Sequence, residues 1–138
     1  GRHDASGAPW YVVGKDVGEN VVYVAQGHAN RWLQSRRLRT APADWVAGHA
    51  PAAQFRCSAR TRYRQQDQGC TVEVAVDRLE VQFDQAQVAV APGQSIVFYA
   101  GAVCLGGAVI AATDAAFGGM APGPAAANGQ PQPLVQHF

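Results

Sequence analysis

Short runs of β-branched, aromatic and aliphatic residues recur along most of the sequence, and turn-forming residues interrupt them about every eight to twelve positions. Pro92-Gly93 and Ala100-Gly101 are two such interruptions, and the chain holds 15 glycines and 8 prolines. Evenly spaced runs of this kind favour a small antiparallel sandwich or a closed barrel over a helical bundle. The predicted strands are 10–13, 21–26, 55–64, 71–76, 79–83, 88–90, 95–99 and 103–110, and the pattern at 32–38 fits a strand better than a helix.

The segment 55–64 has the clearest strand pattern in the chain. Its apolar and polar positions alternate, and the polar set is Arg56, Ser58, Arg60, Arg62 and Arg64. Because alternate side chains of a strand point to opposite faces, we expect four arginines on one surface, about 7 Å apart, close to the phosphate spacing of a nucleic-acid strand. Two interpretations stay open. The arginines contact an anionic partner, or they pair across the sheet with acids such as Glu73, Asp77, Glu80 and Asp84.

The charge of the chain is strongly polarised although its net value is only +1. Residues 31–64 hold eight arginines against one acid, Asp44, so this stretch carries +7 and the remainder carries −6. Arginine is the cation best suited to forked contacts with phosphate and with base edges. The pattern therefore predicts a nucleic-acid partner, while a GC-rich genome or a solvated surface would explain the same arginines without one.

Metal, nucleotide and membrane sites have little support in the sequence. Cys57, Cys70 and Cys104 lie 13 and 34 residues apart, which matches no zinc pattern, and we expect reduced, buried thiols in a soluble cytoplasmic protein. Gly106-Gly107 and Gly118-Gly119 are not followed by a predicted helix, so neither forms a phosphate loop. No apolar run approaches the roughly 18–20 residues of a membrane span. Residues 1–8 lack the apolar core of a secretory signal.

A set of short motifs identifies a family. In order, they are PWYVVGKD at 9–16, VAQGH at 24–28, FRC at 55–57, RYRQ at 62–65, CTV at 70–72, PGQS at 92–95, VFY at 97–99 and VCLGG at 103–107. Together they resemble the later part of the bacterial tRNA-specific 2-thiouridylase family. The resemblance covers about 9–110, roughly three quarters of the chain.

The resemblance implies a particular domain organisation. Family members have an N-terminal ATP-pyrophosphatase domain, a small central domain and a C-terminal β-barrel similar to those of translation factors. We therefore expect an all-β chain in three segments. Residues 1–29 are the trailing hairpin of the central domain, 30–112 form a small closed antiparallel barrel, and 113–138 are a flexible tail rich in alanine, glycine and proline.

The resemblance also implies a function. In the parent enzyme, ATP with Mg activates the anticodon wobble uridine and a persulfide sulfur replaces its oxygen. This chain lacks the ATP loop and the two sulfur-transferring cysteines of the family, so we expect no catalytic residue, cofactor or metal within it. Its implied role is to hold the anticodon region of tRNA, and the family's tRNA contacts carry over to Arg62, Tyr63 and Gln94, with Arg60 and Arg64 as further candidates.

Other functions remain open. Tyr63 also fits an apolar core, and Gln94 also fits a side chain that bonds within its own turn. A protein-interaction barrel would dock its sister domains or a sulfur-relay protein instead of tRNA. An independent thiol enzyme would need one unusually reactive cysteine.

Overall fold

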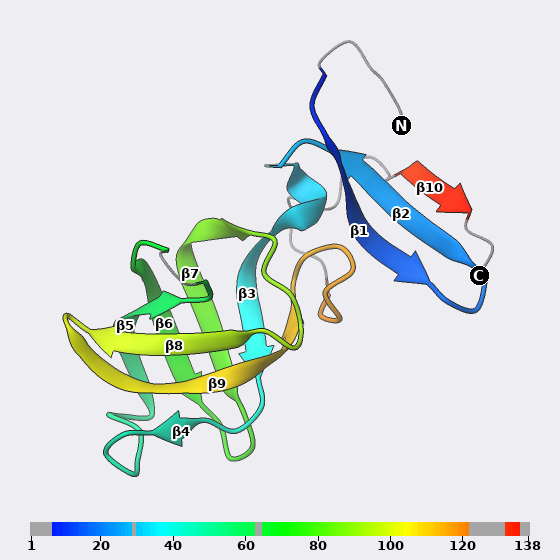
Figure 1. Cartoon of the computed structure of the whole chain (residues 1–138). Coiled ribbons are helices and arrows are strands. Elements are labelled where there is room, and N and C mark those ends of the chain that lie inside the picture. The colour runs from blue at the N-terminus through cyan, green and yellow to red at the C-terminus, as the bar shows by residue number, and fades with distance from the viewer. Residues whose placement is uncertain (1–6, 29, 63–64, 122–131, 136–138) are drawn as a thin grey trace.

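The computed structural model describes residues 7–28, 30–62, 65–121 and 132–135, and within these ranges it contains strands, one short 3-10 helix and no α-helix (Figure 1). Its elements are β1 (Trp10–Asp16), β2 (Val21–Gln26), η1 (Arg31–Leu33), β3 (Gln34–Thr40), β4 (Asp44–Trp45), β5 (Gln54–Arg60), β6 (Gln68–Val74), β7 (Leu79–Val88), β8 (Ser95–Ala100), β9 (Val103–Thr113) and β10 (Gln132–Val135).

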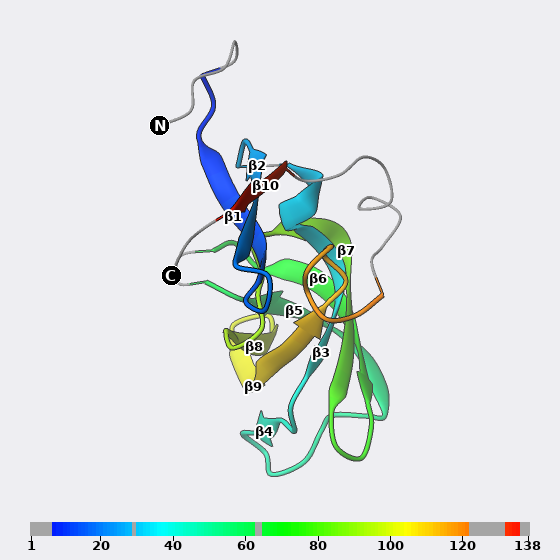
Figure 2. The same ribbon diagram turned by 90° about the vertical axis from the view of Figure 1, so that its right-hand side faces the viewer.

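Six strands form a closed antiparallel barrel, which confirms the predicted fold class. They follow the order β3-β7-β6-β5-β8-β9, and β9 returns to β3 through pairs such as Leu38 with Thr113. Figures 1 and 2 show these strands wrapped around one interior, with β4 at the end opposite η1. Closure gives every barrel strand a neighbour on both sides, which protects apolar strands from pairing with other chains.

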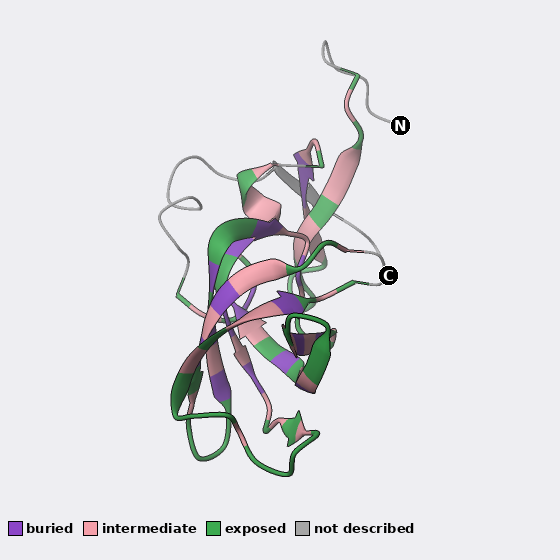
Figure 3. Cartoon of the chain, turned by 90° about the vertical axis from the view of Figure 1, so that its left-hand side faces the viewer, coloured by how far each residue is buried: buried purple, intermediate pink, exposed green. Residues whose placement is uncertain are grey.

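The barrel interior is filled by the apolar positions of the alternating strands. Leu38, Val72, Ile96 and Phe98 are completely buried. Figure 3 shows buried segments along the barrel strands and exposed residues mainly at the turns. Trp45 of β4 packs on this core, with its ring centroid 6.1 Å from that of Phe98.

Gly106 allows β4 to approach β9 closely. An added Cβ at this position would lie 2.2 Å from the carbonyl oxygen of Asp44, and the φ angle of Gly106 is +152°. Residues other than glycine rarely adopt this φ angle, and here their Cβ would clash with the backbone of β4. Gly106 and Gly107 thus lie in β9, between β4 and β8, where they pair with both strands.

The hairpin predicted at the start of the chain is confirmed. β1 and β2 are antiparallel, and β10 adds to the free edge of β2 to make a separate three-stranded sheet. Phe117 connects this sheet to the barrel, because its ring stacks on Tyr23 at a centroid distance of 5.0 Å. The ring lies against Gly14, where an added Cβ would be 2.2 Å from it.

Several predicted strand boundaries differ in the structure, including those of β1, β6 and β9. Residues 88–90 are not a separate strand, because β7 runs to Val88. The strand predicted at 32–38 divides between η1 and β3, and the side chain of Asn30 starts η1 by accepting a hydrogen bond from the amide of Trp32 at 3.0 Å. The strand predicted at 55–64 ends at Arg60.

The predicted tail at 113–138 begins inside β9. Thr113, Asp114 and Ala115 are buried, and the Thr113 amide donates to the carbonyl of Gly118 at 2.8 Å. The first residues of this segment are therefore packed against the barrel, and β10 belongs to the hairpin sheet. Residues 122–131 and 136–138 lie outside the described ranges.

Candidate nucleic-acid interface

The arginine row of β5 is shorter than the alternation predicts. Arg56 and Arg60 lie on the strand, whereas Arg62 follows it in a loop. The side chain of Gln65 causes this turn, because its Oε1 accepts the amide of Thr61 at 2.8 Å. Tyr63 and Arg64 lie outside the described residues. The prediction of four evenly spaced arginines on one strand is therefore wrong.

Arg56 makes the cross-strand ion pair that the sequence left open. Its guanidinium donates two hydrogen bonds to Asp84 of β7, at 2.8 and 2.6 Å, and a third to Thr71 at 3.1 Å. The hydrogen bonds from Arg56, followed by its charge, hold the pKa of Asp84 below its usual value. The pair spans β6 at Gly69, where an added Cβ would lie 2.5 Å from the Asp84 carboxylate.

Arg60 is also paired. Its Nε donates to the carboxylate of Asp67, and its guanidinium lies 5.0 Å from the centre of the Tyr99 ring. The hydrogen bond to Asp67 raises the pKa of the Arg60 guanidinium. Asp67 thus occupies the Nε side of the guanidinium, and a phosphate that binds on that side would have to replace it.

Arg62 and Gln94 have only backbone partners among the described residues. The exposed guanidinium of Arg62 donates to the carbonyl of Val88, at the end of β7. The Oε1 of Gln94 accepts the amide of Ala91 at 3.2 Å, which is the turn-stabilising role that the sequence left as an alternative. Its amide nitrogen makes no hydrogen bond within the described chain.

Two consecutive arginines of β3 both face solvent. Regular strands alternate, but the register of β3 against β7 shifts between Ser35 and Arg37, and both Arg36 and Arg37 are exposed. The buried Asp114 holds this irregularity, since its Oδ1 accepts the amides of Arg36 at 2.9 Å and Arg37 at 3.1 Å. Sequence reasoning missed Asp114, because nothing local to residue 114 indicates a partner in β3.

The described arginines thus fall into two groups. Arg39, Arg56, Arg60 and Arg78 make ion pairs with carboxylates. Within the ranges that the structure covers, Arg31, Arg36, Arg37 and Arg62 make none. Such unpaired, exposed guanidinium groups can contact phosphate without first losing a carboxylate.

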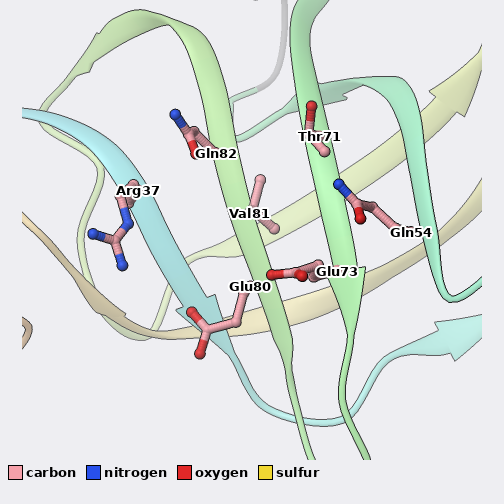
Figure 4. Close-up of a pocket in the computed structure, with 7 residues that line it drawn as sticks. All are labelled: Arg37, Gln54, Thr71, Glu73, Glu80, Val81 and Gln82. Carbon is pink, nitrogen blue, oxygen red and sulfur yellow. The ribbon is translucent and has the colours of Figure 1, made fainter.

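A polar hollow of about 450 Å³ lies beside Arg37 on the outer surface of β3, β7, β6 and β5 (Figure 4). Figure 4 shows Arg37 on one strand and Glu80 and Glu73 on the next two. Burial raises the pKa of Glu80, but hydrogen bonds from Arg39 and Arg78 outweigh it, and the net pKa lies below the usual value. The hollow therefore carries both signs of charge.

Gly106 and Gly107 are strand residues rather than a phosphate loop, and the described part of the chain contains no group of three or more His, Cys, Asp or Glu side chains arranged for a metal.

None of the helices in the described ranges is long and apolar enough to cross a membrane.

The cysteines differ from one another in exposure. Cys70 is buried, Cys57 is half-buried and Cys104 is exposed, so the expectation of three buried thiols is wrong for Cys104. Cys104 stands near the start of β9, next to the tight turn that joins β8 to β9, where a side chain can face solvent.

Comparison with known proteins agrees with this architecture. Residues 35–110 match a family model described as the aminomethyltransferase beta-barrel domain. These residues begin in β3 and end in β9, so the match coincides with the closed barrel.

Curated relatives extend the match over the hairpin. The chain is 60% identical over 109 residues to a protein of Stenotrophomonas maltophilia (strain K279a) named tRNA-specific 2-thiouridylase MnmA, covering 78% of this chain and 29% of the relative. It is 58% identical over 116 residues to a protein with the same name from Xanthomonas campestris pv. campestris (strain B100), covering 83% and 31%. The chain thus spans less than a third of the length of these relatives.

Proposed function

The chain belongs to the tRNA-specific 2-thiouridylase family as its C-terminal part, and from this premise we propose that it is a non-catalytic barrel that docks tRNA. In this proposal the parent enzyme transfers sulfur to the wobble uridine of the anticodon. The ATP site with Mg and the reactive cysteines belong to the N-terminal ATP-pyrophosphatase and central domains of the parent. The barrel contributes by holding the substrate in place, which lowers the entropic cost of bringing a remote base to the reacting groups.

The observation that carries the proposal is the set of exposed arginines without carboxylate partners. Arg36, Arg37 and Arg62 are all exposed, and none makes an ion pair within the described residues. Contacts with phosphate supply a large share of the affinity in nucleic-acid complexes, and arginine binds phosphate through paired N–H groups. The buried Asp114 carboxylate accepts the backbone amides of Arg36 and Arg37 where both side chains are exposed, and this arrangement fits such a role.

We also propose specific contacts for individual residues. Arg62 binds a phosphate, Tyr63 stacks on an unpaired base, and the free amide group of Gln94 donates to RNA. Arg60 and Arg64 add further positive charge, with Arg60 exchanging Asp67 for a phosphate oxygen.

The rest of the organisation follows from family membership. We propose that 1–29 belong to the central domain, that 30–112 are the docking barrel, and that 113–138 extend beyond it. A tRNA-modifying enzyme of this kind works in the cytoplasm, where its tRNA substrates are found.

A titration of labelled tRNA, followed by fluorescence anisotropy at several salt concentrations, tests the docking role. Each phosphate contact contributes roughly 0.7–0.9 to the slope of log affinity against log salt. We expect Arg62→Ala to reduce the steepness by about that amount and the Arg36→Ala/Arg37→Ala double variant to reduce it by about twice as much.

Arg78→Ala is the matched control for these variants. It removes one positive charge, as Arg62→Ala does. Arg78, however, already forms an ion pair with Glu80 at 2.9 Å, in the turn between β6 and β7. We expect an unchanged slope. If tRNA does not bind at low salt, or if all four proteins share one slope, the docking role is wrong. Binding of a sulfur-relay protein or a sister domain in its place would then favour the protein-interaction barrel.

A further inference from the structure

Two of the three cysteines face each other across neighbouring strands. Cys57 of β5 and Cys70 of β6 are directly opposite in the antiparallel register, and their sulfur atoms are 3.7 Å apart. Both side chains are directed toward the barrel core, where Cys70 is completely buried and Cys57 packs at the edge.

We propose that Cys57 and Cys70 form a thiol-oxidation site, a dithiol that oxidants of the hydroperoxide class convert into a disulfide between β5 and β6. The proposal rests on these two strands alone and does not depend on tRNA docking.

The backbone already has the spacing that a disulfide requires. Directly opposed residues of an antiparallel pair have Cα atoms about 4.5–5.5 Å apart, and disulfides span about 4.4–6.8 Å. Bond formation therefore needs the sulfur atoms to close from 3.7 Å to about 2 Å by side-chain rotation, without separating the strands.

The two thiols are unequal in a way that suits stepwise oxidation. The hydrogen bond with Cys70, followed in the same direction by the charge of Arg56, lowers the pKa of Cys57, whereas the hydrogen bond and burial raise that of Cys70. Cys57 is also the more accessible of the two. Thiolate character and access are the properties that make a cysteine react first.

The chemistry balances with hydrogen peroxide as the oxidant. The Cys57 thiolate attacks one peroxide oxygen, the O–O bond breaks, and hydroxide leaves with a sulfenic acid on Cys57. The Cys70 sulfur then displaces the sulfenic oxygen, and its proton leaves with that oxygen as water. In total, two thiols lose two electrons and two protons, and one peroxide becomes two water molecules.

The disulfide would close a covalent loop from Cys57 to Cys70. This loop includes Arg60 at the end of β5 and Arg62 just after it, and in its described part the side chain of Gln65 accepts the Thr61 amide. A disulfide acts mainly by restricting the unfolded chain, so a link at Cys57 and Cys70 makes separation of β5 from β6 less favourable. Oxidation of the pair is therefore coupled to opening at the Thr61 amide, which follows β5 directly.

Mass spectrometry of the 138-residue chain tests the site. In a Cys104→Ser background, which removes the exposed thiol, brief treatment with hydrogen peroxide should lower the intact mass by about 2 Da. Trypsin should then release peptides 57–60 and 65–78 as one linked species that a reductant separates. Hydrogen exchange should slow at the Thr61 amide after oxidation.

The control is Cys57→Ser in the same background, which keeps the buried Cys70 and its packing. This protein should show neither the mass loss nor the linked peptide. The proposal is overturned if the Cys104→Ser protein keeps two free thiols after treatment. A gain of about 32 Da at Cys57, which marks sulfinic acid, would overturn it as well. Unchanged exchange at Thr61 would overturn the coupling to the loop.

Discussion

Replacement of Asp114 by alanine removes the buried carboxylate that organises the irregular part of β3. Its Oδ1 accepts the amides of Arg36 and Arg37 at 2.9 and 3.1 Å, and the residue is only 7% exposed. Hydrogen bonds to charged acceptors contribute about 1.5–3 kcal/mol each. Water can reach these amides in part once the carboxylate is gone, so we expect a total loss of roughly 2–4 kcal/mol.

Urea denaturation measures this loss directly. With a slope of about 2 kcal/mol per molar urea, typical of a small protein, the Asp114→Ala midpoint should fall by roughly 1–2 M. Asp114→Asn is the matched control, because its side-chain oxygen can still accept both amides without the charge. We expect it to lose less than half as much. Equal midpoints for Asp114→Ala and the unmodified chain, or equal losses for both variants, would refute the role of these hydrogen bonds.

Three further predictions concern the barrel. Gly69→Ala should push the Asp84 carboxylate away from Arg56, because the new Cβ would lie 2.5 Å from it, and NMR titration should show the pKa of Asp84 rising toward its ordinary value. Since the pKa of Asp84 is depressed in the folded state, the stabilisation it provides is present above the ordinary aspartate pKa of 3.8 and disappears as the pH falls through the folded value. Asp84→Asn should therefore lower the urea midpoint at neutral pH and have a shrinking effect in acid, and a constant effect would contradict the ion pair. Phe98→Ala empties a completely buried position and should cost about 3–5 kcal/mol in the same assay, and a loss under about 1 kcal/mol would contradict tight packing there.

Much of the fold was predictable because strand patterns are local. Alternation in 55–60 comes from the two-residue repeat of an extended backbone, and the turn at Pro92-Gly93 comes from the conformations of those two residues. The hairpin, most barrel strands and the closed barrel were predicted from such signals together with the family motifs. The end of β5 was not, because it depends on Gln65 bonding back to the Thr61 amide.

The arginine-rich composition of 31–64 is a property of the sequence, and it gives this stretch a formal charge of +7. Which guanidinium groups stay available was decided only by the tertiary structure. Arg56 meets Asp84 28 residues later, and Asp114 holds the amide of Arg36 78 residues earlier. Such contacts depend on strand register and barrel closure, which bring distant segments together. The residues beside either partner therefore do not indicate the contact.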